Sequence, residues 1–161
     1  MATEPTTIGI NLGTRYAGYA VIVGSELRDW RVKVIYGKTL IEKFQCLTGI
    51  LTRLLDTYTP GSVVLKKSHP SRTSDTLNRL QLEAKAFLEE QDLLVKEYKL
   101  EQLKMRLLPG KRANKIKLTE FVVTKYPILL TDWERECSLK RDYRMVMFEA
   151  VALAVTRAID K

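Results

Sequence analysis

The sequence has few of the residues from which small disulfide-bonded or zinc-binding domains are built. It has two cysteines, Cys46 and Cys137, which lie far apart and in no motif, and one histidine, His69, in a polar loop. This scarcity argues against a disulfide framework and against a zinc site made of cysteine and histidine. Reduced thiols, and with them a cytoplasmic location, are expected.

Long apolar segments are also absent. No apolar run approaches the roughly 18 residues of a membrane span. The first residues, MATEPTT, have neither the basic nor the apolar region of a signal peptide. No repeat, low-complexity stretch or interdomain linker is found. With 161 residues, 45% of them apolar and 29% charged, the chain is expected to form one globular domain over residues 1–161, with no membrane partner.

Acidic residues are the third deficit. The 27 Lys and Arg residues outnumber the 19 Asp and Glu residues and give a net charge of +8. A basic domain of this kind suits a polyanionic partner, most often nucleic acid. It suits equally well a surface whose charge only keeps the protein soluble, so charge alone does not decide between the two.

The pattern of apolar residues predicts an α/β fold. Glycine-punctuated apolar runs predict an antiparallel meander at the start of the chain, and apolar residues three or four apart predict helices after it. In order, the elements predict a mixed five-stranded sheet, with a three-strand antiparallel meander followed by parallel strands, flanked by helices. The expected strands are 7–12, 17–23, 27–37, 62–67 and 93–98, and the expected helices are 39–58, 75–91, 115–126 and 141–160, with a short helix or extended element at 100–108.

Four stretches, taken in order, carry a resemblance to a known family. They are IGINLGTRYAGYAVI (8–22), PGSVVLKK (60–67), PGKRANKIKLTEFV (109–122) and EAVALAVTRAI (149–159). Together they resemble the RuvC-type Holliday-junction resolvases, which are small ribonuclease H-like nucleases that act as dimers on four-way DNA junctions. The resemblance implies a ribonuclease H-like fold, DNA or structured nucleic acid as partner, and a homodimer paired through the helix expected at 75–91.

The same resemblance places the family's four metal-binding acids on Asn11, Lys66, Val146 and Glu149. Phosphodiester hydrolysis of this type needs two Mg²⁺ or Mn²⁺ ions held by converging carboxylates. Of the four positions, only Glu149 keeps an acid. A laboratory substitution of aspartate would account for Asn11 but not for Lys66 and Val146. We therefore expect a catalytically inactive homologue with no catalytic residue, no metal and no cofactor.

Glu149 has apolar neighbours at helical spacing, where an unpaired carboxylate is costly. We expect Lys66 and Glu149 to form an ion pair, with Asn11 hydrogen-bonded to it. In one alternative, Lys66 extends to solvent and Glu149 is partly exposed. In another, acids such as Asp75 and Glu83 rebuild a metal site, which would make the chain an active Mg- or Mn-dependent structure-specific endonuclease.

Basic residues gather in the second half of the chain. Between residues 96 and 117 there are eight Lys or Arg residues and two Glu residues. Groups of this kind bind phosphates with affinity but without sequence specificity. A solvated helix face is the alternative for the cluster, and a protein-interaction scaffold is the alternative function. The residues expected to contact nucleic acid are Lys67, Arg72, Lys111, Arg112, Lys115 and Lys117.

Overall fold

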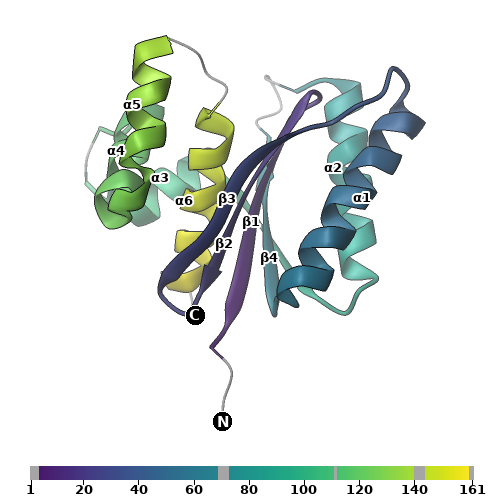
Figure 1. Ribbon diagram of the computed structural model, residues 1–161, viewed down its shortest axis with the longest axis horizontal. Coiled ribbons are helices and arrows are strands. Elements are labelled where there is room, and N and C mark those ends of the chain that lie inside the picture. The colour runs from purple at the N-terminus through teal and green to yellow at the C-terminus, as the bar shows by residue number, and fades with distance from the viewer. Residues whose placement is uncertain (1–3, 69–72, 111, 140–143, 160–161) are drawn as a thin grey trace.

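A five-stranded mixed sheet forms the centre of the protein (Figure 1). The computed structural model describes residues 4–68, 73–110, 112–139 and 144–159. Strands β1, β2 and β3 form an antiparallel meander, and β4 runs parallel to both β1 and β5. The spatial order is β3-β2-β1-β4-β5, which confirms the predicted sheet. The strands are β1 Thr6–Leu12, β2 Tyr16–Val23, β3 Glu26–Val34, β4 Ser62–Lys67 and β5 Leu94–Lys99.

Helices cover both faces of this sheet. In Figure 1, α1 and α2 lie against one face, and α6 lies against the other with α3, α4 and α5 outside it. None of the helices in the described ranges combines the length and the apolar character needed to cross a membrane. The helices are α1 Leu40–Tyr58, α2 Asp75–Glu89, α3 Leu100–Leu107, α4 Lys115–Lys125, α5 Leu130–Leu139 and α6 Met145–Ile159, with a 3₁₀ turn at Pro127–Leu129.

Helix α6 is the element on which the second layer is built. Residues Met147 to Thr156 are all buried, so the helix is apolar on nearly every side, as expected for a helix enclosed between a sheet and other helices. It approaches the sheet closely because β1 and β2 carry glycines beneath it. A Cβ added at Gly9 would lie 2.2 Å from the carbonyl oxygen of Ala150, and one added at Gly18 would lie 2.5 Å from that of Val146. These two glycines therefore allow α6 to pack close to the sheet and so determine the position of its first turns.

The third strand and the last helix differ from their predicted bounds. Strand β3 ends at Val34, not at residue 37, because the chain turns: Ile35 donates its backbone N–H to Arg15, and Gly37 has a φ of 134°. Helix α6 begins at Met145 in the described chain. The predicted start at 141 lies outside the described residues.

Helix α5 was not predicted, because its apolar stripe is short, with only Leu130, Trp133 and Cys137 at helical spacing between polar residues. It meets the rest of the protein largely through polar groups: Asp132 accepts a hydrogen bond from the Trp30 indole at 3.1 Å, and Arg144 lies 3.6 Å from both Asp132 and Glu136. Glu136 is only 3% exposed. Trp133 adds an edge-on ring contact with Phe148 of α6, at 5.8 Å between centroids. A helix held by ion pairs and one aromatic ring gives little periodic signal in the sequence.

Candidate functional site

The four positions that the resemblance assigned to metal-binding acids lie together. Asn11 and Lys66 each come one residue after a paired position, Ile10 and Leu65, in the neighbouring parallel strands β1 and β4. Because parallel strands end at the same edge of a sheet, both side chains reach that edge. Val146 and Glu149 lie in the first turns of α6, which packs over β1 and β2.

Glu149 is the centre of this cluster, which we call the Glu149 pocket and define as Asn11, Lys66, Lys115 and Glu149. Its Oε2 accepts hydrogen bonds from Lys66 Nζ at 2.5 Å and from Asn11 Nδ2 at 2.9 Å. Its Oε1 lies 3.3 Å from Lys115 Nζ. The predicted ion pair and its hydrogen bond from Asn11 are therefore confirmed.

Burial decides between the two positions considered for Lys66. Its side chain is 17% exposed and that of Glu149 is 5% exposed. The alternative in which Lys66 extends to solvent beside a partly exposed carboxylate is wrong. The physical reason is that Glu149 sits among buried residues of α6, where a carboxylate needs a cation and hydrogen-bond donors to offset the loss of water.

The geometry also explains the amide at position 11. Asn11 is 7% exposed, and its Nδ2 donates to the Glu149 carboxylate and, at 3.3 Å, to the main-chain carbonyl oxygen of Val146. Both partners are acceptors, so the position requires a donor. An ionised aspartate there would place a second negative charge against Glu149 and leave the carbonyl without its hydrogen bond.

This donor set does not fit a pair of divalent metal ions. Mg²⁺ and Mn²⁺ need several oxygen ligands, most of the attraction coming from carboxylates. Here both oxygens of the single carboxylate already contact ammonium or amide hydrogens, and Val146 presents no ligand atom on its side chain. Across the described ranges, no three His, Cys, Asp or Glu residues come close enough to hold a metal ion. Asp75 and Glu83 are exposed on α2.

The basic residues predicted to contact nucleic acid lie at three places in the described chain. Lys115 belongs to the Glu149 pocket, a contact that the sequence did not reveal. Arg112 and Lys117 are exposed at the start of α4, where Lys117 Nζ donates to the carbonyl oxygen of Arg112 at 3.1 Å. Lys67 is exposed at the end of β4, beside Lys66. The other predicted contacts, Arg72 and Lys111, lie outside the described residues, as does His69.

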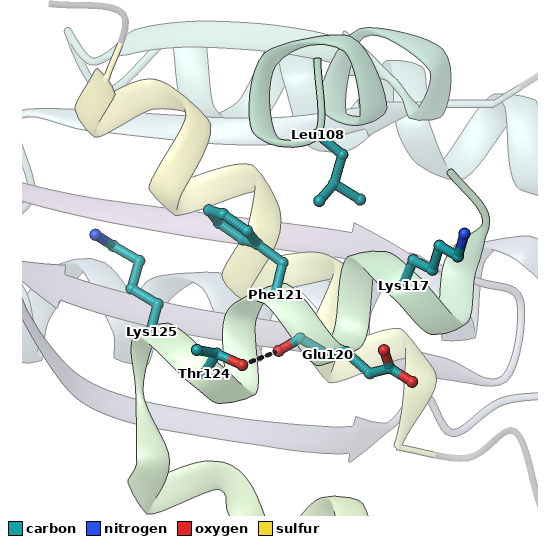
Figure 2. A pocket seen from close by; sticks show the side chains of 6 residues that line it. All are labelled: Leu108, Lys117, Glu120, Phe121, Thr124 and Lys125. Atoms are coloured by element: carbon teal, nitrogen blue, oxygen red, sulfur yellow. Dashed lines mark hydrogen bonds between the residues drawn. The ribbon is translucent and has the colours of Figure 1, made fainter. Parts of the chain in front are cut away.

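An open groove of about 600 Å³ follows the outer face of α4. Figure 2 shows Lys117 and Lys125 at its two ends, with the Phe121 ring and Leu108 between them. Glu120 also lines the groove, and its carbonyl oxygen accepts a hydrogen bond from the Thr124 hydroxyl at 2.8 Å. The groove thus has an apolar middle and basic ends, and it shares the start of α4 with the Glu149 pocket.

A second, partly buried polar cluster joins β2 and β3 to α1. Asp29 Oδ2 accepts hydrogen bonds from the hydroxyl groups of Tyr19 at 3.0 Å and Tyr58 at 2.8 Å. Burial, together with the Asp29 charge, raises the pKa of Tyr58 to about 12 and raises that of Tyr19 further. Both phenols therefore stay protonated at neutral pH and act as hydrogen-bond donors. The cluster links the sheet to helix α1.

Solved structures of Holliday-junction resolvases share this fold. RuvC of Thermus thermophilus, in complex with a Holliday junction substrate, is 19% identical with a TM-score of 0.72, over 96% of this chain and 92% of that chain. The yeast mitochondrial resolvase Ydc2 is 12% identical, with a TM-score of 0.69 over 98% and 80%. The Fowlpox virus resolvase, in complex with Holliday junction DNA, is 14% identical, with a TM-score of 0.62 over 96% and 97%.

The chain therefore has the RuvC-like, ribonuclease H-like fold that the sequence resemblance implied. At these identities the likeness establishes the fold and not the activity. No protein-family model and no curated protein matches the sequence.

Proposed function

We propose that this chain is a nucleic-acid-binding protein that uses the RuvC-like fold without cleaving phosphodiester bonds. The observation that carries the proposal is the state of Glu149, whose two carboxylate oxygens are taken by Lys66, Asn11 and Lys115. A carboxylate neutralised in this way does not attract a divalent cation, and two-metal hydrolysis requires a pair of them. The pocket suits an inactive homologue of the resolvases.

Nucleic acid is the favoured partner because the Glu149 pocket is surrounded by further positive charge. Arg112 and Lys117 are exposed beside it, and Lys67 follows it on β4. Two of the structural neighbours are resolvases bound to Holliday junction DNA. We infer that this protein binds a branched DNA or a similarly structured nucleic acid. We also infer a homodimer through α2, whose Leu82 is 68% exposed.

A binding and cleavage assay on one substrate tests the proposal. The full chain is mixed with a fluorescently labelled four-way DNA junction in Mg²⁺ or Mn²⁺, and both anisotropy and strand integrity are followed. We expect binding whose affinity falls steeply between about 50 and 200 mM salt, because bound lysines release counterions from the phosphates. We expect intact strands at every metal concentration. Strand cleavage that is lost in Glu149→Gln would establish the endonuclease alternative instead, and absence of both binding and cleavage would favour a protein-interaction scaffold.

Reversing the charge of the loop before α4 should weaken binding without changing its selectivity. The variant Lys111→Glu with Arg112→Glu is expected to lose roughly tenfold or more in affinity for unrelated sequences alike, because phosphate contacts carry no sequence information. Anisotropy titrations against several junctions and duplexes measure this.

The matched control for this variant is Lys38→Glu with Arg53→Glu, which changes the net charge equally. Both control residues are exposed, and they lie just before and on α1, across the sheet from α4. The control should bind within about twofold of the unmodified chain if the contacts are local rather than due to net charge. Equal losses of affinity in the two variants would show that Lys111 and Arg112 are not part of the binding surface.

A further inference from the structure

The Glu149 pocket carries an excess of positive charge at the point where two metal ions would supply it in an active two-metal site. Glu149 contributes one negative charge, while Lys66 and Lys115 contribute one positive charge each and Asn11 is neutral. The pocket therefore has a net charge of +1. An excess cation beside buried side chains favours an anionic ligand.

Both ammonium groups keep hydrogen-bond donors for such a ligand. An ammonium group has three N–H donors, and within the described chain the one acidic partner of Lys66 and of Lys115 is Glu149. Lys66 is 17% exposed and Lys115 49% exposed. Glu149 thus holds two cations from different elements, β4 and α4, close to the same carboxylate; Lys115 is half exposed, and Lys66 is largely buried but not fully enclosed.

The start of α4 adds to this anionic preference. Lys115 is its first residue, Asn114 caps it by accepting from the Lys117 N–H, and its first turn has no acidic residue. A helix N-terminus carries partial positive charge and free N–H groups, so cationic side chains there repel the helix dipole unless an anion lies nearby. Glu149 offsets the charge of Lys115, and the exposed Lys117 side chain adds a further positive charge at the same helix start, so this surface favours an anionic ligand.

We propose that the Glu149 pocket binds one backbone phosphate of the nucleic acid through the ammonium groups of Lys66 and Lys115, which replace the divalent ions of a two-metal site. The inference rests on the proposed function, because it names the group that this surface recognises. Glu149 acts here as a positioning residue that holds both lysines in place before the phosphate arrives. Binding through this pocket consequently needs no metal ion.

The variant Lys115→Gln tests the lysine contact, because Lys115 is half exposed and its loss leaves the Lys66–Glu149 pair intact. We expect affinity for a labelled four-way junction to fall roughly tenfold at low salt, and the slope of log affinity against log salt to decrease by about one. Lys115→Arg, which keeps the positive charge, should have nearly the affinity and the salt slope of the unmodified chain. The matched control is Lys38→Gln, which removes one exposed charge from the chain just before α1, across the sheet from α4, and should change neither quantity.

The unmodified chain and Lys115→Gln also test whether phosphate binding through the pocket is independent of metal ions. The ratio of the affinities of the unmodified chain and Lys115→Gln is measured in EDTA and in Mg²⁺ at equal ionic strength. Because both proteins meet the same DNA, any effect of Mg²⁺ on the shape of the junction cancels in the ratio. We expect the same ratio under both conditions.

The outcomes separate this inference from the proposed function. Failure of the unmodified chain to bind nucleic acid would overturn both. Binding that is equally strong in Lys115→Gln and Lys38→Gln would leave the proposed function standing and overturn the phosphate site. Binding that requires Mg²⁺, with a ratio that approaches one in EDTA, would overturn the replacement of metal ions by lysines.

Discussion

A chain that carries Asn11→Asp, Lys66→Glu and Val146→Asp together is expected to be less stable than the unmodified protein in EDTA and to be rescued by Mn²⁺. The three substitutions place carboxylates beside Glu149 at the positions where the resemblance implies metal ligands. Without metal, four acids at one edge of the sheet repel one another, and the Lys66 ammonium that neutralised Glu149 is gone. With metal, the same acids become a ligand set for hard divalent ions.

The size of the rescue follows from mass action. A ligand that binds only the folded state stabilises it by about 2.7 kcal/mol at one hundred times its Kd. Thermal unfolding in EDTA and in saturating Mn²⁺ measures this, and a rise in Tm of several degrees is expected for the triple variant. Strand cleavage of the junction in Mn²⁺ is the second readout, since the pocket would then hold the ions that hydrolysis requires.

Two control proteins show whether the effect of Mn²⁺ on Tm is due to the new carboxylates. The unmodified chain should show no change in Tm with Mn²⁺, because its Glu149 is already neutralised by lysines. The single variant Lys66→Glu should be destabilised in EDTA and gain less from Mn²⁺, since two acids make a poorer site than four. A clear Mn²⁺ stabilisation of the unmodified chain would contradict the account of the pocket given above.

The central part of this pocket could be predicted from the sequence because its physical requirement is local. Glu149 lies in a run of apolar residues, and a buried carboxylate must find a cation and donors. The resemblance then named Lys66 and Asn11 as its neighbours, and the structure places both against it. The meander and the parallel strands were predictable for a similar reason, because short apolar runs bounded by glycine or by turn residues mark each strand locally.

The contact between Lys115 and Glu149 could not be predicted in the same way. Lys115 resembles its neighbours Arg112 and Lys117 in the sequence, and all three were expected to contact nucleic acid. What distinguishes it is its place as the first residue of α4, from which its Nζ lies 3.3 Å from Oε1 of Glu149. Helix α5 was missed because its contacts lie outside the helix itself: a hydrogen bond from Trp30 and the ion pairs with Arg144 leave no periodic pattern within residues 130–139.

The second large effect concerns the ion pair itself. Lys66→Met is expected to lower the free energy of unfolding by about 3–5 kcal/mol, because it leaves Glu149 buried without its closest cation. Lys115 compensates only in part, since its Nζ lies farther away, at 3.3 Å, and its side chain is 49% exposed, so the loss should fall toward the lower end of this range. Urea unfolding of each variant gives the free energies to compare.

Replacing both partners should be far less damaging than replacing one. In Lys66→Met with Glu149→Leu, no buried charge remains unpaired, and the apolar side chains extend the core around α6. The loss that remains is about 1–2 kcal/mol, because Asn11 gives up one of its two acceptors and keeps the carbonyl of Val146. The double variant should therefore be more stable than Lys66→Met alone, although two substitutions in a buried region usually destabilise a protein more than one.

The exposed pair of Lys85 and Glu97 provides the reference for this comparison. Its atoms are 2.7 Å apart, and its side chains are 38% and 29% exposed. Water screens such a pair, so Lys85→Met is expected to cost no more than about 1 kcal/mol. If Lys66→Met cost as little as Lys85→Met, or if the double variant were as unstable as Lys66→Met, the ion pair would not be what stabilises this edge of the sheet. The presence of a buried carboxylate at position 149 would then need an explanation other than that it holds two lysines in place.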